Sequence, residues 1–341
     1  MAESFVIGVD LGGTKIYTAL AKNNGELLAE VKILTEAAGG LKHVVRRIVH
    51  TVEQVKKQSG INNRLACLGI GAPGFLDPEK GTVHQAPNLG WFDVPLKKIL
   101  EEALHLPVVI DNDANLAALG ERIFGAAQGV DDMVYVTVGT GIGGGLVLGG
   151  KLYSGTSFSA GEIGHLTIDP DGYLCSCGNR GCLEAHASGT AIVRLARELV
   201  ERGQGQGIIQ VAGGKDKITA QCVSLAAATG DEEALMVLTQ TGKSLGIGLA
   251  NIINLLNPAL ILLGGGVMQA GKLFWEAMEG EINKRALLVA RQQVQVIPAA
   301  LGQRSGLMGA IALAIQASDI KPFPFEGEGI DESYFRKRSL R

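Results

Sequence analysis

Two glycine-rich segments of the chain combine a flexible backbone with hydroxyl side chains, and one of them also begins with a carboxylate. One is Asp10–Lys15, which reads DLGGTK, and the other is Gly139–Gly144, which reads GTGIGG. Glycine lets a phosphate approach backbone N–H groups directly, a leading aspartate can hold a hydrated magnesium ion, and threonine adds hydroxyl donors. We therefore predict that the two loops grip one polyphosphate from both sides, although the first loop alone also fits a tight hairpin. The predicted nucleotide contacts are Asp10, Gly12, Gly13, Thr14, Lys15, Thr137, Gly139, Thr140 and Gly141.

The second loop also fits the GxGxxG pattern of dinucleotide-binding folds. In such a fold a helix begins within the loop, whereas here the β-type residues Leu146–Tyr153 follow, broken by a glycine pair. A Walker-type loop is disfavoured as well. The GxxxxGK match at Gly266–Lys272 is followed by Leu273, where the magnesium-binding Ser or Thr is required.

A run of polar residues follows the apolar residues Val108–Ile110. This segment, Asp111–Asn115, reads DNDAN and lies where a predicted strand gives way to a predicted helix. It fits a helix cap, but three polar residues in a row exceed what one cap needs. A carboxylate that accepts a hydroxyl proton is the recurring general base of phosphoryl transfer to alcohols. We therefore predict that Asp113 is a catalytic base.

Three cysteines and a histidine form the strongest local signal, and they are His165, Cys175, Cys177 and Cys182. Three thiolates and one imidazole complete a tetrahedral zinc site, which leaves no position for a catalytic water, so the ion is predicted to be structural. Free thiols or a disulfide are the alternatives. If zinc fixes this loop, then Glu162, Glu184 and the second nitrogen of His165 present an acceptor-rich set suited to a polyol.

The elements that must position these residues follow a repeated pattern. A three-strand meander, a helix capped at Gly60 and a later strand and helix are predicted in the first part, and the meander recurs after residue 132. The predicted strands are 5–10, 16–21, 27–31, 65–70, 108–111, 133–138, 146–148, 152–153 and 259–263. The predicted helices are 41–55, 114–124, most of 198–240 with an interruption near 203–214, 245–256 and 307–317. The segments 71–90 and 139–145 are predicted to be loops.

This repetition predicts a duplicated α/β architecture in which two lobes face each other across a ligand-binding cleft. We expect a small N-terminal lobe at 1–117, completed by the C-terminal helix 305–318. A large lobe with the zinc loop is expected at 118–304, and a tail at 319–341. The length of 341 residues agrees with two domains of ordinary size.

Composition narrows the possible partners. Lys and Arg number 31 against 34 Asp and Glu, which argues against a nucleic-acid or membrane-surface partner. The first ten residues contain no basic region before their apolar run, so neither a signal peptide nor a transit peptide is predicted, and a cytoplasmic location is expected. The uncharged stretch Ser244–Gly271 is long enough to cross a bilayer, but its asparagines, proline and glycines favour a buried helix followed by a buried strand.

Taken together, these segments resemble the ROK family of sugar kinases, within the two-lobed ATPases related to actin and hexokinase. The resemblance covers roughly Val6 to Ala317. It rests on DLGGTK at Asp10, APG at Ala72, APNLGW at Ala86, DNDAN at Asp111, GTGIGGG at Gly139, AGEIGH around Gly161 and CSCGNRGCLEA at Cys175. The segments APNLGW and CLEAHASGTA are most similar to the bacterial glucokinases of the family.

The resemblance implies a duplicated actin-like (ribonuclease H-like) ATPase fold and ATP-dependent phosphorylation of a hexose, with Asp113 as the matching base. It implies that Gly264, Gly265 and Gly266 lie beside the adenosine, and that the chain forms a homodimer or a dimer of dimers. The sugar contacts that match by motif are Asn88, Asn112, Glu162, His165 and Glu184, and the matching zinc ligands are His165, Cys175, Cys177 and Cys182. The regulatory branch of the family carries a DNA-binding helical domain before the first phosphate loop, whereas nine residues precede Asp10 here, so a repressor is not expected.

We therefore expect a cytosolic enzyme that uses ATP and Mg²⁺, with a structural Zn²⁺, to phosphorylate the 6-hydroxyl of D-glucose. N-acetylmannosamine, fructose and mannose are alternative substrates, because few side chains around one ring position decide that choice. A dinucleotide-dependent oxidoreductase and a noncatalytic sugar-sensing module are the alternatives outside this class.

Overall fold

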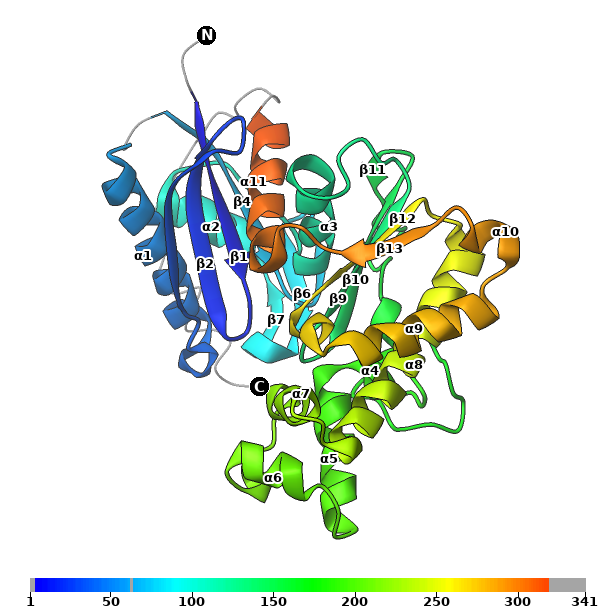
Figure 1. Ribbon diagram of the computed structural model, residues 1–341. Coiled ribbons are helices and arrows are strands. Elements are labelled where there is room, and N and C mark those ends of the chain that lie inside the picture. The colour runs from blue at the N-terminus through cyan, green and yellow to red at the C-terminus, as the bar shows by residue number, and fades with distance from the viewer. Residues whose placement is uncertain (1–3, 62–63, 319–341) are drawn as a thin grey trace. The chain divides into compact units, whose positions relative to one another are not determined.

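The computed structural model describes residues 4–61 and 64–318 and divides the chain into two compact units (Figure 1). The first unit comprises Met1–Gln128, Ser154–Ala160 and Gln303–Arg341, and the second comprises Gly129–Tyr153 and Gly161–Gly302. We predicted a division between residues 117 and 118. The structure instead divides the chain after Gln128, because a helix runs through the expected boundary. The predicted tail 319–341 lies outside the described residues.

The first unit contains a five-stranded sheet of order β3-β2-β1-β4-β8. Its strands are β1 (Phe5–Leu11), β2 (Lys15–Lys22), β3 (Leu27–Leu34), β4 (Leu65–Ala72) and β8 (Val108–Asn112). The first three strands form the predicted antiparallel meander, and β4 and β8 run parallel to β1. In register, Asp10 of β1 is opposite Gly71 of β4, which is opposite Asp111 of β8. The DLGGTK and DNDAN segments therefore meet at the same edge of this sheet.

Helices pack on the sheet of the first unit, with α1 (Gly40–Ser59) against β2 and β3 and α11 (Ser305–Ser318) against β1 and β4 (Figure 1). Five apolar residues of α1 recur at helical spacing and are buried, and Gly60 caps the helix at φ 71°, as predicted. A Cβ on Gly69 of β4 would lie 2.0 Å from the carbonyl oxygen of Ala310, so α11 can approach the sheet only over glycine. The same helix packs against α3 (Asp113–Phe124) through Gly309.

The segment 71–90, predicted to be a loop, contains regular structure. A three-stranded antiparallel sheet forms from β5 (Phe75–Asp77), β6 (Thr82–Ala86) and β7 (Trp91–Val94), and α2 (Leu96–Leu104) follows it. The prediction was wrong because these strands are very short and are interrupted by proline and glycine, which mark turns in a sequence. These strands are stabilised by pairing with one another, which the local sequence pattern does not show.

The second unit contains a five-stranded sheet of order β11-β10-β9-β12-β13. Its strands are β9 (Met133–Val138), β10 (Ile142–Leu148), β11 (Lys151–Leu152), β12 (Leu260–Gly264) and β13 (Gln295–Pro298). An antiparallel meander is again followed by two strands parallel to its first strand, so the predicted duplication is confirmed. The second glycine loop is shorter than the predicted 139–145, because β10 begins at Ile142. A strand and not a helix follows this loop, which argues against a dinucleotide-binding fold.

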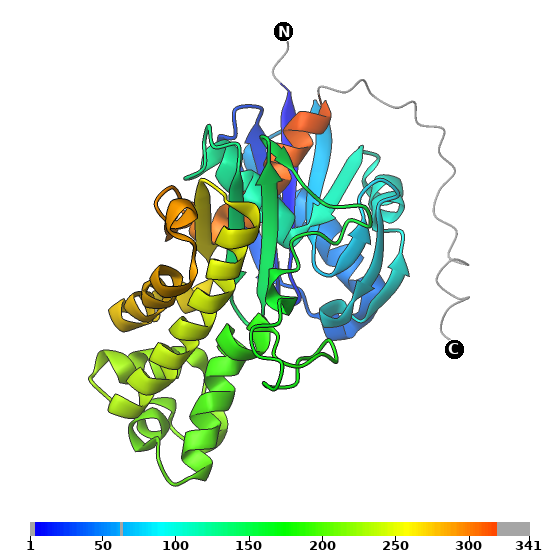
Figure 2. The same cartoon turned by 90° about the vertical axis from the view of Figure 1, so that its right-hand side faces the viewer.

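Most of the second unit outside its sheet is helical, and Figure 2 shows these helices from green to orange. They are α4 (Leu183–Ala187), α5 (Gly189–Glu201), α6 (Gln206–Ala212), α7 (Ala220–Ala228), α8 (Glu232–Leu256), α9 (Lys272–Arg285) and α10 (Leu288–Arg291). The predicted helix 245–256 is the second half of α8, and α6 lies inside the predicted interruption. Within the described part of the chain, none of the helices has the length and apolar character that crossing a bilayer requires.

Candidate active site

The first glycine loop is a tight hairpin that joins β1 to β2. The N–H of Gly12 donates to the carbonyl oxygen of Lys15 at 2.9 Å, and the hydroxyl of Thr35 donates to the carbonyl oxygen of Gly12 at 2.7 Å. A Cβ on Gly13 would lie 2.9 Å from the Cβ of Asn88, so glycine is required where Asn88 approaches the loop. The structure thus brings a predicted sugar contact next to a predicted phosphate contact.

Asp10 lies at the end of β1, next to this hairpin. Burial raises the pKa of Asp10 to about 6, and the positive charge of Lys32 opposes that shift. A Cβ on Gly306, in the first turn of α11, would lie 3.0 Å from the carboxyl carbon of Asp10. A carboxylate whose charge is disfavoured by burial fits the role of holding a hydrated cation, because a divalent ion would offset that charge.

The DNDAN segment spans the end of β8 and the start of α3. Asn112 is the N-cap of α3, and its side-chain oxygen accepts from the N–H of Ala114 at 2.8 Å and of Asn115 at 3.3 Å. Its amide nitrogen donates to the carbonyl oxygen of Gly74 at 3.2 Å. The cap interpretation therefore describes Asn112. One hydrogen of the Asn112 amide group donates to Gly74, so the other hydrogen remains for the predicted contact with a sugar.

The two aspartates of this segment differ in their surroundings. Asp111 is buried, which raises its pKa, and it accepts hydrogen bonds from the Asn112 N–H at 2.6 Å and the Asn115 side chain at 2.9 Å. It serves to hold the turn. Asp113 is half-buried at the first residue of α3, and one of its oxygens accepts from the Ala114 N–H at 2.8 Å. Its Cα lies 3.6 Å from the position of a Cβ on Gly71, so glycine lets this carboxylate sit close to the sheet edge.

The second glycine loop joins β9 to β10 and is held from several directions. The N–H of Gly139 donates to the carbonyl oxygen of Gly141 at 2.9 Å, and the N–H of Ile142 donates to Oε2 of Glu184 at 2.9 Å. At the same edge of the sheet, Gly264 of β12 is in register with Thr137 of β9. The chain then turns through Gly265 and Gly266, and a Cβ on Gly266 would meet no atom within 4 Å.

The predicted zinc ligands lie together. One ligand atom from each of His165, Cys175, Cys177 and Cys182 lies within 4.8 Å of every other. The Sγ atoms of Cys177 and Cys182 are 3.7 Å apart, and Sγ of Cys175 is 3.7 Å from Nδ1 of His165. Ligands at the usual zinc distances on a tetrahedron are separated by about 3.5–3.8 Å, so these four atoms fit one zinc ion.

The imidazole of His165 joins this cluster to the predicted sugar contacts. Its Nδ1 faces Cys175, while its Nε2 lies 3.9 Å from a carboxylate oxygen of Glu162. Burial raises the pKa of Glu162, the charge of His165 opposes this, and the carboxylate of Glu184 adds to it. The three predicted sugar contacts of the second unit, Glu162, His165 and Glu184, therefore share one neighbourhood, as expected from the sequence.

The structure therefore assembles the predicted residues within each unit. The first unit carries Asp10, Gly12, Gly13, Thr14, Lys15, Asn88, Asn112 and Asp113, and the second unit carries Thr137, the Gly139–Gly141 loop, Gly264–Gly266, the zinc cluster, Glu162 and Glu184. Sequence reasoning missed the contacts of Thr35 and Thr190, whose hydroxyls hold the loops, because each threonine is distant from its partner along the chain. It also missed the hydrogen bond between Glu184 and Ile142.

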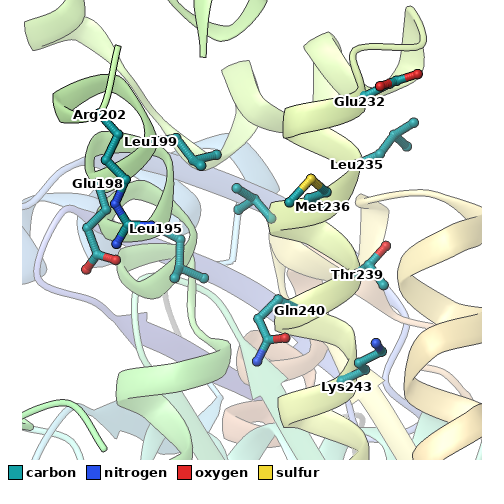
Figure 3. A pocket seen from close by; sticks show the side chains of 11 residues that line it. Leu195, Glu198, Leu199, Arg202, Glu232, Leu235, Met236, Thr239, Gln240 and Lys243 are labelled. Atoms are coloured by element: carbon teal, nitrogen blue, oxygen red, sulfur yellow. The ribbon is translucent and has the colours of Figure 1, made fainter. Parts of the chain in front are cut away.

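A pocket of about 560 Å³ lies between α5 and α8 in the second unit (Figure 3). Apolar side chains such as Leu195, Leu199 and Met236 line it, with Glu198 and Arg202 among its charged residues. None of the predicted site residues lines this pocket. It is therefore a feature distinct from the site described above.

A profile of the ROK family matches residues 6–317, nearly the whole described chain. The chain belongs to the ROK family. This membership and the likeness to solved ROK structures confirm the predicted actin-like ATPase fold. Members of this family that are similar to the chain include both enzymes and regulators.

A glucokinase from Halalkalibacterium halodurans is 39% identical over 91% of this chain and 94% of that protein. A xylose repressor from Caldicellulosiruptor bescii is 36% identical over 94% of this chain and 79% of the repressor. The crystal structure of a ROK glucokinase from Streptomyces griseus, in complex with glucose and AMPPNP, superposes with a TM-score of 0.80. It is 37% identical and is matched over 92% of this chain and 100% of that one. The similarity to the two glucokinases supports sugar kinase activity for this chain.

Proposed function

We propose that this ROK-family protein transfers the γ-phosphoryl group of ATP to the 6-hydroxyl of D-glucose, giving glucose 6-phosphate and ADP. The observation that carries the proposal is the sheet edge of the first unit, where Asp10, the glycine hairpin and Asp113 come together. The similarity to glucokinases, one of them solved with glucose and AMPPNP, supports the choice of both substrates.

In this mechanism Asp113 is the general base. Its carboxylate accepts the proton of the 6-hydroxyl as that oxygen attacks the γ-phosphorus, and the bond from the γ-phosphorus to the β–γ bridging oxygen breaks. The N–H groups of both glycine loops stabilise the charge that develops on the phosphates. Magnesium bound near Asp10 would neutralise charge on the β- and γ-phosphates.

The sugar is held by Asn88, Asn112, Glu162, His165 and Glu184. Carboxylate oxygens accept hydrogen bonds from sugar hydroxyls, the Nε2–H of a His165 that binds zinc through Nδ1 donates one, and asparagine amides can donate or accept. Zinc bound by His165 and the three cysteines would fix the loop that carries Glu162 and precedes Glu184. A loop fixed in this way would hold the sugar contacts in one arrangement before the sugar binds.

A panel of sugars assayed with ATP and Mg²⁺, with ADP release as the readout, tests the proposal. We expect the highest kcat/KM with glucose and lower values with mannose, fructose and N-acetylmannosamine. A higher kcat/KM with one of those three would make the protein a ROK kinase for that hexose. ADP release with none of them would rule out the kinase.

A sugar-responsive regulator is the second candidate, because the chain is similar to xylose repressors. The presence of Asp113 at the sheet edge favours the enzyme, since a sensor needs no base. Xylose in the same panel separates the two candidates. Xylose that binds without any ADP release from any sugar would favour the regulator.

The protein is proposed to work in the cytosol as a homodimer or a dimer of dimers. Multi-angle light scattering on the purified protein measures its mass directly. A mass equal to one chain at micromolar concentration would contradict this assembly.

A further inference from the structure

Every loop that binds phosphate through its backbone N–H groups also carries carbonyl oxygens. The lone pairs of those oxygens repel phosphate oxygens, so the loop must keep its carbonyls turned away from the ligand. In both glycine loops of this protein, a threonine from outside the loop holds a loop carbonyl. Thr35 belongs to none of the sequence motifs, and Thr190 lies within CLEAHASGTA, which gives no sign of this contact.

In the first unit the anchor is Thr35, which directly follows β3. Its hydroxyl donates to the carbonyl oxygen of Gly12 at 2.7 Å, and its N–H donates to the carbonyl oxygen of Thr14 at 2.8 Å. Thr35 is fully buried. One residue therefore holds both ends of the Gly12–Thr14 turn.

In the second unit the anchor is Thr190, near the start of α5. Its hydroxyl donates to the carbonyl oxygen of Thr140 at 2.7 Å, and its N–H points to the same oxygen at 3.3 Å. The preceding residue, Gly189, donates its N–H to the carbonyl oxygen of Gly139 at 2.7 Å. The two threonines come from different elements, a strand end and a helix start, and yet bind their loops in the same way.

Because peptide groups are planar, the held carbonyl oxygens determine where the neighbouring N–H groups of the loops point. The described peptide bonds are trans, and in a trans peptide the C=O of one residue and the N–H of the next point in opposite directions. With the Gly12 and Thr140 carbonyls held by threonine, the N–H groups of Gly13 and Gly141 point away from the anchors. The hydrogen bond from Gly189 to the carbonyl oxygen of Gly139 likewise turns the N–H of Thr140 away from Gly189.

We propose that Thr35 and Thr190 are positioning residues, which fix the peptide planes of the two loops so that the N–H groups of Gly13 and Gly141 face the nucleotide phosphates. This inference rests on the proposed ATP-binding function. Neither threonine belongs to the predicted sugar contacts, so their effect should fall on the nucleotide alone.

The test uses Thr190→Val and Thr35→Val, which remove each hydroxyl and keep the shape of the side chain. Thr190 is exposed, so its valine variant should fold even if the buried Thr35 variant does not. Thr190→Ser and Thr35→Ser restore the hydroxyl. Matched controls are Thr219→Val, an exposed threonine that caps α7, and Thr51→Val, a buried threonine whose hydroxyl binds Ile48 of α1.

Calorimetry with Mg²⁺ and AMPPNP should show a Kd weakened about 3- to 10-fold in each valine variant, the usual effect of one hydrogen bond. The serine variants and both controls should bind like the wild type. The glucose Kd without nucleotide should stay within about 2-fold in every variant. An unchanged AMPPNP Kd in folded Thr190→Val would overturn the inference and leave the kinase intact. A wild-type protein that does not bind AMPPNP would overturn both.

Discussion

The carboxylate of Glu184 accepts a hydrogen bond from the N–H of Ile142 at 2.9 Å. A Cβ on Gly141 would lie 2.3 Å from the same oxygen, so this approach depends on glycine in the loop. Glu184 is two residues from Cys182, a predicted zinc ligand, and is itself a predicted sugar contact. One side chain thus links the zinc cluster, the sugar contacts and the phosphate loop.

Substitution of Glu184 should separate these roles. Glu184→Gln keeps an oxygen that accepts from Ile142 but loses the negative charge, whereas Glu184→Ala removes both. We expect both variants to weaken glucose binding, and only the alanine variant to weaken AMPPNP binding, by about 10-fold. Calorimetry with each ligand measures this. The link between the two sites would be refuted by an alanine variant that binds AMPPNP as tightly as the wild type.

The raised pKa of Asp10 predicts a pH-dependent stability. Because burial raises this pKa from 3.8 to about 6, the folded protein holds the proton more tightly than the unfolded chain. The stability that comes from protonated Asp10 is complete below pH 3.8 and is lost as the pH rises through about 6. Asp10→Asn should therefore be more stable than the wild type at pH 8, by on the order of 1–3 kcal/mol. The difference should shrink toward pH 5.

Thermal unfolding of both proteins, without nucleotide and with EDTA, checks this prediction at pH 5 and pH 8. Both proteins share all other titrating groups, so their difference isolates Asp10. A difference in Tm that is the same at both pH values would show that burial does not shift this carboxyl group.

The zinc cluster predicts that Cys177→Ser loses metal. A serine hydroxyl is a poor zinc ligand, and loss of the ion should loosen the loop that holds Glu162 and His165. We expect less than one equivalent of zinc, a lower Tm and a weaker glucose Kd. Cys222→Ser, outside the cluster, is the control and should retain the metal. Elemental analysis that finds no zinc in the wild-type protein would contradict the assignment.

The close packing of α11 on α3 predicts a large effect of Gly309→Ala. A Cβ at Gly309 would lie 1.6 Å from the carbonyl oxygen of Leu116, so one helix must shift. We expect a loss of about 1–3 kcal/mol in the free energy of unfolding. Gly280→Ala, exposed on α9 with no atom within 4 Å of its Cβ, should instead stabilise the protein by up to about 1 kcal/mol. Urea unfolding measures the free energy of unfolding of both variants. Equal stability of the two variants would show that the contact of Gly309 with Leu116 does not require glycine.

The sequence predicted those parts of the protein whose cause is local. The two meanders alternate apolar runs with glycine turns, and the ligands of the zinc cluster are close enough in the chain to be recognised by spacing. Asp113 was predicted from its place after a strand, and the structure puts it at the carboxyl end of β8. Its role as base remains a prediction.

The features that the sequence did not predict depend on contacts between distant segments of the chain. Nothing near Thr35 or Thr190 in the sequence indicates that their hydroxyls hold phosphate loops, because each partner is more than 20 residues away. The sheet β5–β7 and the edge strand β13 consist of short strands that only pairing stabilises. The division between the units was displaced because α3 belongs with α11, a helix from the other end of the chain.

In the proposed reaction, Asp113 removes the proton of a sugar hydroxyl during phosphoryl transfer from ATP. Asp113→Asn keeps the size of the side chain and an oxygen for the Ala114 N–H, but it cannot take up a proton. The decisive measurement is single-turnover transfer from radiolabelled ATP to glucose, together with the glucose and AMPPNP Kd values. We expect a rate lowered about 10²- to 10⁴-fold, with both Kd values within a few-fold of the wild type. A variant that transfers phosphate at nearly the wild-type rate would contradict it.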